Sequence, residues 1–237
     1  VEPLSLGKRR ASSPFRGAFI CKRRTTLESI IFDIDGTLWD SRALVAEGYN
    51  IQLRSEGVAD RCVTAEVLRP LFGKVMTEIA DALFPDIAPE PRYALMERCM
   101  AAENRYLHEN PCRIGYPKVR ETMEALAKRH RLFIVSNSQQ GYPELCIQKM
   151  GLEGCISGHL CFGDTGTDKG TTIRILLEKY GISSAVYVGD TQGDMEATYA
   201  AGLPFVWADY GFGTPEKYDA RISSFEELLT LEQEGRL

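Results

Sequence analysis

The sequence lacks the features that mark several classes of protein. No apolar run approaches the roughly 18 residues that a membrane-spanning helix requires. The three histidines are dispersed, and the seven cysteines form no Cys-x-x-Cys pair. An odd number of scattered cysteines disfavours both a zinc site and a disulfide framework. We therefore expect a cytoplasmic protein with no membrane partner and with buried free thiols.

Acidic residues outnumber basic ones outside the first 26 residues. This segment holds seven Lys and Arg and one acid, a net charge of +6, which leaves −11 for the rest of a chain whose net charge is −5. A basic, Ser-rich start resembles a transit peptide, and it could also be an arm that touches nucleic acid. The absence of apolar periodicity favours a tail outside the fold, or a misassigned start. The acidic remainder argues against nucleic acid as the partner.

Short apolar segments alternate with helical patterns along most of the chain. The segments with β-branched residues predict buried parallel strands at 27–33, 131–137, 184–190 and 203–209. Helix-like spacing and terminal glycines predict helices at 116–130, 142–151 and 170–181. This alternation predicts an α/β fold built on a doubly wound parallel sheet.

Residues 41–112 interrupt the alternation with four helix-like segments separated by glycine and proline. We interpret them as a small helical domain inserted after the first strand. The core domain is then formed by residues 27–40 and 113–237. The alternative is a helical layer packed directly on the sheet.

Four aspartates follow predicted strands. Asp33 and Asp35 come after the first, Asp190 ends a later one, and Asp194 stands four residues further on, at the start of a helix. Because ligands bind at the carboxyl ends of parallel strands, we expect these carboxylates to meet at one edge. They would repel one another, and a hard cation relieves that repulsion. Oxygen ligands favour Mg²⁺ over Zn²⁺.

Donors for a phosphate lie beside the same predicted edge. Ser136 and Asn137 end the second predicted strand, and Lys169 opens a helix. With a phosphate in place, one carboxylate can attack phosphorus and another can transfer protons. Paired aspartates at a strand end therefore indicate phosphoryl-group chemistry.

The order of these motifs resembles the haloacid dehalogenase superfamily of phosphatases with a helical cap. The matching stretches are "DIDGT" at 33–37, "VSNS" at 135–138, Lys169, and "GDTQGD" at 189–194. The start "FDIDGTLWDS" is similar to phosphoglycolate phosphatases and their relatives, including β-phosphoglucomutase. The resemblance covers about residues 29–230 and implies a Rossmann-like core with a cap inserted after the first strand.

The resemblance also implies roles. Asp33 would be the nucleophile and a metal ligand, while Asp35 would be the general acid and base and offer its backbone carbonyl to the metal. Asp190 and Asp194 would hold Mg²⁺. The donors Ser136, Asn137 and Lys169 would bind the phosphoryl group.

The inserted helices are expected to select the substrate, a small phosphorylated metabolite such as phosphoglycolate or a sugar phosphate. Lys74, in a segment that resembles the part of the cap facing the site, could reach a substrate anion or lie on the surface. Trp39 could line the entrance or pack between core and cap, and Tyr49 is a further candidate. The alternatives to a phosphatase are a phosphotransferase and a non-catalytic binding protein. The sequence indicates no particular oligomeric state.

Overall fold

A six-stranded parallel sheet organises the protein, whose computed structural model describes residues 27–58 and 60–237. The strands lie in the order β3-β2-β1-β4-β5-β6, and neighbouring strands are parallel. Their bounds are β1 Ser29–Phe32, β2 Arg131–Ser136, β3 Ile156–Cys161, β4 Ala185–Gly189, β5 Phe205–Ala208 and β6 Ala220–Ile222. The predicted doubly wound α/β fold is confirmed. The basic segment 1–26, predicted to be a tail, lies outside the described residues.

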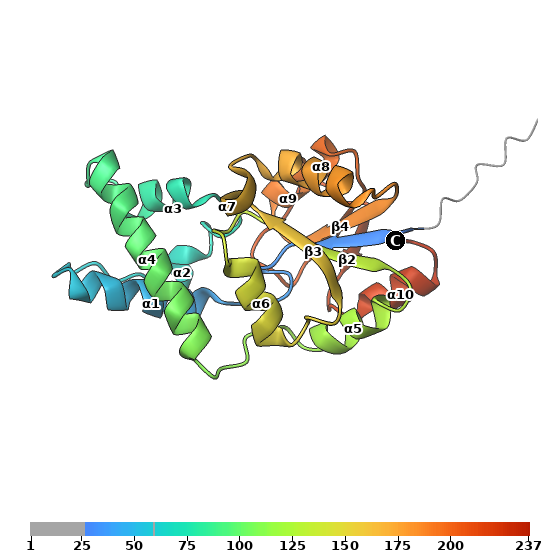
Figure 1. Cartoon of the computed structure of the whole chain (residues 1–237), viewed down its shortest axis with the longest axis horizontal. Helices are drawn as coiled ribbons and strands as arrows, with labels where there is room; N and C mark the ends of the chain where they lie inside the picture. Colours follow the sequence, from blue (N-terminus) through green and yellow to red (C-terminus); the bar gives the residue numbers. More distant parts are fainter. Residues whose placement is uncertain (1–26, 59) are drawn as a thin grey trace, which may run out of the picture.

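Helices cover both faces of the sheet (Figure 1). Their bounds in the core are α5 Val119–Leu126, α6 Tyr142–Met150, α7 Phe162–Thr165, α8 Lys169–Tyr180, α9 Gln192–Ala200 and α10 Glu227–Gln233. Successive side chains of β1 point to opposite faces. Ile31 packs in the cluster formed with α8 and α9, and Ile30 and Phe32 pack in the cluster that includes α5 and α10. Both faces are thus buried, which explains the continuous apolar sequence of β1.

Two strands were missed by the sequence interpretation. Strand β3 has the sequence "ISGHLC", whose first four residues are at least partly exposed at the sheet edge, so it lacks the apolar run that marked the others. Strand β6 is only three residues long and occupies the opposite edge. The helix predicted at 116–130 is also shorter, because Lys118 has a φ of 64° and α5 begins only at Val119.

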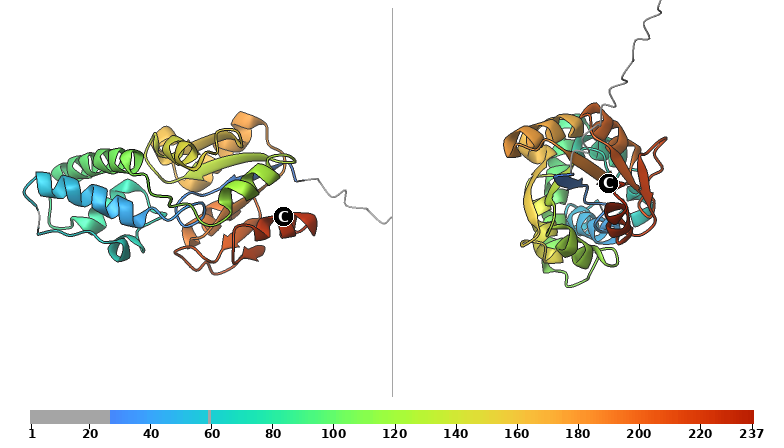
Figure 2. Two further views of the ribbon diagram at one scale, coloured as in Figure 1. Left: turned by 90° about the horizontal axis from the view of Figure 1, so that it is seen from below. Right: turned by 90° about the vertical axis from the view of Figure 1, so that its right-hand side faces the viewer.

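The first four helices after β1 lie together at the carboxyl ends of the strands (Figure 1). We call residues 41–112 the insert. Its helices are α1 Arg42–Ser55, α2 Ala65–Leu68, α3 Met76–Leu83 and α4 Pro89–Glu109. They pack mainly on one another, with α1 alongside α4, and α4 also contacts α6 of the core. They lie beyond the end of the sheet rather than over either face (Figures 1 and 2). The division into a core domain and an inserted helical domain stays a prediction.

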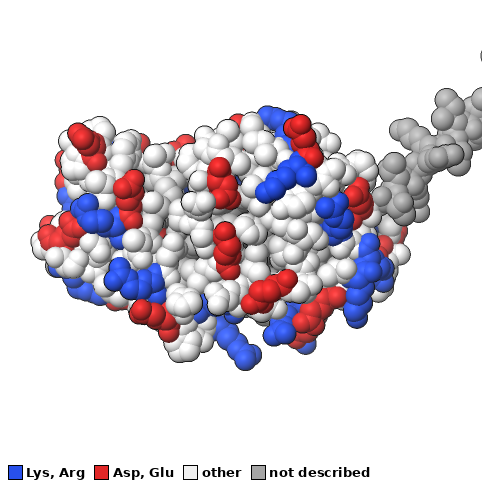
Figure 3. Space-filling view, in the orientation of Figure 1, with Lys and Arg blue, Asp and Glu red and all other residues white. Residues whose placement is uncertain are grey.

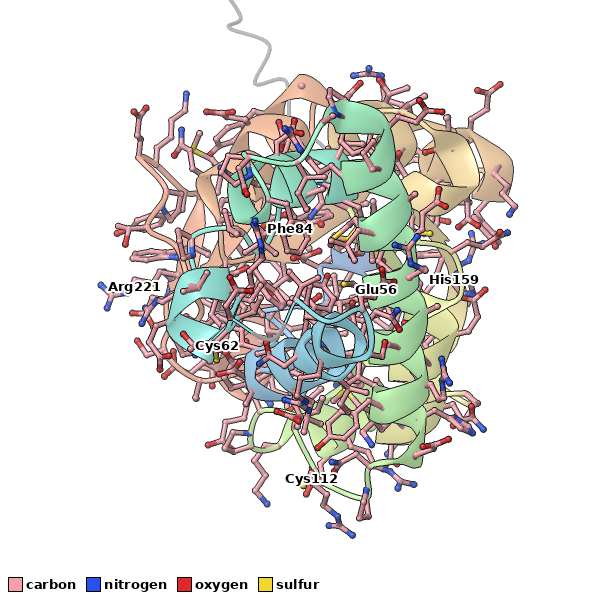
Figure 4. All side chains as sticks on the ribbon, turned by 90° about the vertical axis from the view of Figure 1, so that its left-hand side faces the viewer. Glu56, Cys62, Phe84, Cys112, His159 and Arg221 are labelled. Atoms are coloured by element: carbon pink, nitrogen blue, oxygen red, sulfur yellow. The ribbon has the colours of Figure 1, made fainter. Side chains whose placement is uncertain are left out.

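Looking onto the insert, Figure 4 shows α4 running beside α1 with Glu56 next to it. Glu56 follows α1 and forms an ion pair with Arg98 of α4. Two segments of the chain connect the core to the insert, and their backbones are hydrogen-bonded to each other. The Tyr116 N–H donates to the Leu38 carbonyl, and the Asp40 N–H donates to the Ile114 carbonyl. The two segments are therefore held side by side.

The surface carries acidic and basic side chains intermixed on the face that Figure 3 shows. The six cysteines among the described residues are free thiols, as expected. The expectation that they are buried is wrong for Cys62 and Cys112, which are exposed. None of the helices in the described part of the chain is long and apolar enough to cross a membrane.

Candidate active site

The first two candidate aspartates stand on a tight turn after β1. The Asp33 N–H bonds to the Val188 carbonyl of β4, which extends the strand pairing by one residue. The turn that follows contains Gly36 at a φ of +84°. A Cβ at Gly36 would lie 2.2 Å from Oδ2 of Asp190, so only glycine lets this turn pass so close to the second strand end.

The strand order reverses between β1 and β4, and a buried charged cluster lies at this point. Lys169 Nζ donates to Asp33 Oδ1 at 2.9 Å and to Asp194 Oδ1 at 2.6 Å. Carboxylate oxygens of Asp33, Asp190 and Asp194 lie within 4.8 Å of one another. Three of the four predicted carboxylates therefore meet at one sheet edge, where open α/β sheets bind ligands, and the Asp35 carboxyl group is not part of this cluster.

Asp190 is enclosed by the loop that follows β5. The Phe212 N–H donates to Asp190 Oδ2 at 2.7 Å. A Cβ at Gly211 would lie 2.4 Å from Asp190 Cβ, which makes this position another close approach. The other oxygen, Oδ1, is buried and has no hydrogen-bond partner among the described residues. A carboxylate oxygen left in this way is suited to a cation.

The charges in the cluster do not balance without a cation. Burial raises the pKa of Asp33 to about 7, although Lys169 opposes the shift. Burial, and then the charge of Asp194, raise the pKa of Asp190 well above its usual value. Burial acts on Asp194 in the same direction, but Lys169 and the Thr191 hydrogen bonds outweigh it and lower its pKa. One lysine thus serves three buried carboxylates, and a divalent ion bound by oxygen ligands fits the remaining negative charge.

Both carboxylate oxygens of Asp194 already accept hydrogen bonds from the protein. Besides Lys169, it accepts from the N–H and hydroxyl groups of Thr191, which caps α9. These contacts indicate that Asp194 fixes Lys169 and the loop after β4, whereas Asp33 and Asp190 have more freedom to bind an ion directly.

Asp35 is held by three donors on one oxygen. Its Oδ1 accepts from the Trp39 indole at 2.8 Å, from the Ser41 hydroxyl at 2.6 Å and from the Tyr142 hydroxyl at 2.9 Å. Burial raises the pKa of Asp35 to about 6, and these hydrogen bonds limit the rise. A carboxyl group with this pKa can give and take a proton near neutral pH.

The predicted phosphate donors also surround the site. Ser136 ends β2, is buried, and accepts a hydrogen bond from the Ser138 N–H at 3.2 Å. The Asn137 side chain donates to the Gly73 carbonyl of the insert at 2.7 Å. Asn137 is therefore also a contact between core and insert, which the sequence did not indicate.

A cavity between core and insert opens onto these residues. It measures about 470 Å³ including its opening, and we call it the inner cavity. Its core side includes Asp33, Asp35, Ser136 and Asn137. The lining residues from the insert are Val45, Tyr49, Leu68, Phe72, Gly73, Lys74, Met76, Ile79 and Glu103. A second, wider cavity adjoins Lys169 and Thr191, and its lining also includes Asn137 and Lys74.

The structure separates the three specificity candidates. Tyr49 is buried and lines the inner cavity, and Lys74 is exposed and lines both cavities. Trp39 is fully buried and lines neither cavity; its indole holds Asp35. This placement favours packing over the entrance for Trp39. Sequence reasoning missed Glu103 and Tyr142, which carried no signal beyond their helical patterns.

Comparison with known proteins identifies the family. The profile of the family described as "Haloacid dehalogenase-like hydrolase" matches residues 30–208. The chain belongs to this family. Phosphoglycolate phosphatase of Agrobacterium fabrum (strain C58) is 30% identical over 77% of this chain and 80% of its own. Phosphoglycolate phosphatase of Aquifex aeolicus (strain VF5) is also 30% identical, over 83% of this chain and 90% of its own.

A solved structure agrees with the fold. A predicted phosphoglycolate phosphatase from Haemophilus somnus 129PT superposes with a TM-score of 0.75 at 24% identity, covering 89% of this chain and 100% of that one. The family and the fold inferred from the sequence motifs are thus confirmed, as is the inference of a hydrolase of the phosphatase type.

Proposed function

We propose that the protein is a Mg²⁺-dependent phosphatase that hydrolyses a small phosphorylated metabolite through an aspartyl-phosphate on Asp33. One observation supports this most directly. Three buried carboxylates gather around Lys169 at the point where the strand order reverses, beside a cavity that Asp33 and Asp35 line.

The residues present fit the proposed ion. Asp33 and Asp190 would hold it, with the Asp35 backbone carbonyl, and Asp194 would act directly or through water. The unpartnered Oδ1 of Asp190 supports this assignment. When bound, Mg²⁺ would supply positive charge to the phosphoryl oxygens.

The chain's own groups account for the reaction. An Asp33 oxygen attacks phosphorus, and the bond from phosphorus to the leaving oxygen breaks. Asp35 gives its proton to that oxygen and then takes one from the water that attacks the aspartyl-phosphate. The second attack breaks the bond to Asp33 and releases phosphate. Lys169, the Ser136 hydroxyl and the Asn137 N–H stabilise the phosphoryl charge throughout.

The insert is proposed to act as a cap domain that selects the substrate. Its residues form much of the inner cavity wall, opposite Asp33 and Asp35 of the core. The relatives carry the name phosphoglycolate phosphatase, which supports a small phosphorylated substrate of that general kind.

The test is a panel of phosphorylated metabolites and p-nitrophenyl phosphate, assayed for released phosphate with Mg²⁺ and with EDTA. We expect hydrolysis with Mg²⁺ and none with EDTA. Product analysis separates water from a sugar hydroxyl as the acceptor, and so distinguishes a phosphatase from a phosphotransferase. If the folded protein with Mg²⁺ hydrolyses none of the esters, the proposal is wrong and a binding role gains support.

A further inference from the structure

A single carboxyl group of the insert faces the inner cavity. Glu103 lies on α4, is 4% exposed, and lines this cavity with Asp33 and Ser136. Its Oε2 is buried and has no hydrogen-bond partner among the described residues. Burying a carboxyl oxygen without a hydrogen-bond partner lowers the stability of the fold. An apolar side chain of similar size would carry no such desolvation penalty. The proposed phosphatase chemistry does not use this group.

The position of Glu103 is fixed by close packing. A Cβ at Gly48 of α1 would lie 2.7 Å from the Glu103 Cα, so glycine lets α1 approach α4 at this residue. Burial raises the pKa of the Glu103 carboxyl group, and hydrogen bonds with Tyr49, the next residue along α1, and with Gln139 of the core oppose the rise. The carboxyl group is therefore held from the insert and from the core.

The other insert residues around the cavity are chiefly apolar: Val45, Leu68, Phe72, Met76 and Ile79. A leaving group in the cavity thus meets apolar side chains and the Glu103 carboxyl. Asp35 lines the same cavity, so a ligand that brings a carboxylate meets two acidic groups. Lys74 is the lysine of the same lining, but it is exposed, and water weakens its charge more than that of buried groups.

We propose that Glu103 binds the leaving group, and that the site selects phosphate monoesters whose leaving group carries a hydrogen-bond donor, a hydroxyl or an ammonium, over those that carry a carboxylate. This inference rests on the proposed phosphatase function. The substrate proposed for this chain differs from the one in the names of its relatives, because phosphoglycolate carries a carboxylate where the donor would be.

Matched esters test the proposal at pH 9, where the Glu103 carboxyl group, whose pKa burial raises to about 8, is ionised. 2-Hydroxyethyl phosphate, phosphoethanolamine, phosphoglycolate and propyl phosphate have leaving groups of similar size and differ in the terminal group. We expect the hydroxyl or the ammonium ester to exceed phosphoglycolate in kcat/KM by about tenfold or more, the scale of one hydrogen bond to a charged group. Comparison of these two esters shows which donor is preferred. A kcat/KM for phosphoglycolate equal to or greater than that of both donor-bearing esters would overturn the proposal.

Glu103→Gln keeps the size of the side chain and removes the negative charge that it carries at pH 9. We expect it to reduce the preference over phosphoglycolate by about tenfold. Glu97→Gln, an exposed change on the same helix, is the control and should leave this preference unchanged. An unchanged preference in Glu103→Gln, with a normal circular-dichroism melt, would refute the role of Glu103.

A binding measurement separates this inference from the proposed function. Isothermal titration of Asp33→Asn with the four esters and Mg²⁺ at pH 9 should rank the affinities in the same order. Adding Glu103→Gln to this variant should make the four affinities similar. This result would support the selection even if no ester is hydrolysed. Equal affinities in the presence of Glu103 would contradict it whether or not the protein is a phosphatase.

Discussion

Asn137 ties the core to the insert at the edge of the active site. Its side-chain amide donates to the Gly73 carbonyl at 2.7 Å, although the two residues lie 64 positions apart in the sequence. Gly73 has a φ of +87°, and a Cβ there would lie 3.2 Å from the Thr191 methyl group. The turn at Gly73 thus rests on two core loops, those after β2 and β4. The hydrogen bond holds the insert against residues that are proposed to bind phosphate and metal.

Asn137→Ala should loosen this contact while leaving the residue 137 N–H available for the phosphoryl group. Loss of one neutral hydrogen bond, about 1 kcal/mol, predicts about a fivefold fall in kcat/KM. Hydrogen exchange of residues 71–76 should become faster in the variant, because closure of the insert depends on this bond. Unchanged exchange together with unchanged kinetics would show that the bond has no part in closure.

Asp33→Asn should abolish phosphate release with little effect on the fold. The amide is nearly the same size as the carboxylate but is a poor nucleophile. The measurement is kcat for p-nitrophenyl phosphate with Mg²⁺, alongside a thermal melt. A folded variant that keeps activity within about tenfold of wild type, or about 1.4 kcal/mol of barrier, would exclude Asp33 as the nucleophile.

Asp190→Asn should raise the melting temperature in EDTA while eliminating activity. Burial and the charges of Asp194 and Asp33 raise the pKa of Asp190, which costs stability near neutral pH. The amide avoids this cost, and its oxygen can still accept from the Phe212 N–H. Mg²⁺ should stabilise the wild type and have a much smaller effect on the variant, since binding to the folded state raises stability. Equal stabilisation of both proteins by Mg²⁺ would place the ion elsewhere.

Lys169→Met should have the opposite effect on stability. Lys169 is 5% exposed and pairs with Asp33 and Asp194, so its loss leaves buried carboxylates without their cation. Breaking such a pair costs about 3–5 kcal/mol. Urea unfolding in EDTA measures this loss, and Lys179→Met, an exposed change on the same helix, is the control. A loss below about 1 kcal/mol, no more than an exposed ion pair contributes, would show that Lys169 does not balance the cluster.

The sequence predicted most of the cluster because strand-end residues are encoded locally. Asp33 and Asp190 each follow an apolar run, and a parallel sheet brings such ends to one edge whatever the length of chain between them. The hydrogen-bond partners of Asp35 could be predicted only in part from nearby residues in the sequence. Trp39 and Ser41 are near in sequence, but Tyr142 is 107 residues away, on a helix whose pattern showed only an apolar face.

The inner cavity could not be predicted, since its shape depends on how the insert sits on the core. Gly73 and Glu103 reach the site through the packing of α1 on α4 and through the Asn137 contact. No local pattern encodes that placement. Glu103 stood among charged residues on α4, and its burial follows from Gly48, which lies far away in the sequence.

The ionisation of Glu103 gives a prediction that needs no substrate. Burial, and then the charge of Asp35, raise its pKa from 4.5 to about 8, while hydrogen bonding to Tyr49 and Gln139 opposes the rise. The other titratable groups coupled to it are Cys99 and Tyr142. Between pH 4.5 and 8 the folded protein therefore retains a proton on Glu103 that the unfolded chain has lost. Stability from this group is present in full below about pH 4.5 and falls as the pH rises to about 8.

Glu103→Gln cannot titrate at this position, so comparison with wild type isolates the effect from that of the aspartates. The free energy of unfolding of wild type, relative to the variant, should fall by up to about 1.4 kcal/mol per pH unit between pH 5 and 8 and then level off. Urea unfolding at pH 5, 6.5, 8 and 9 in EDTA provides the values, with Glu97→Gln as the control. A constant difference from pH 5 to 8 would mean that Glu103 is ionised in the folded protein throughout that range. The carboxyl group would then face the inner cavity as a permanent negative charge, which would favour an ammonium over a hydroxyl as its partner.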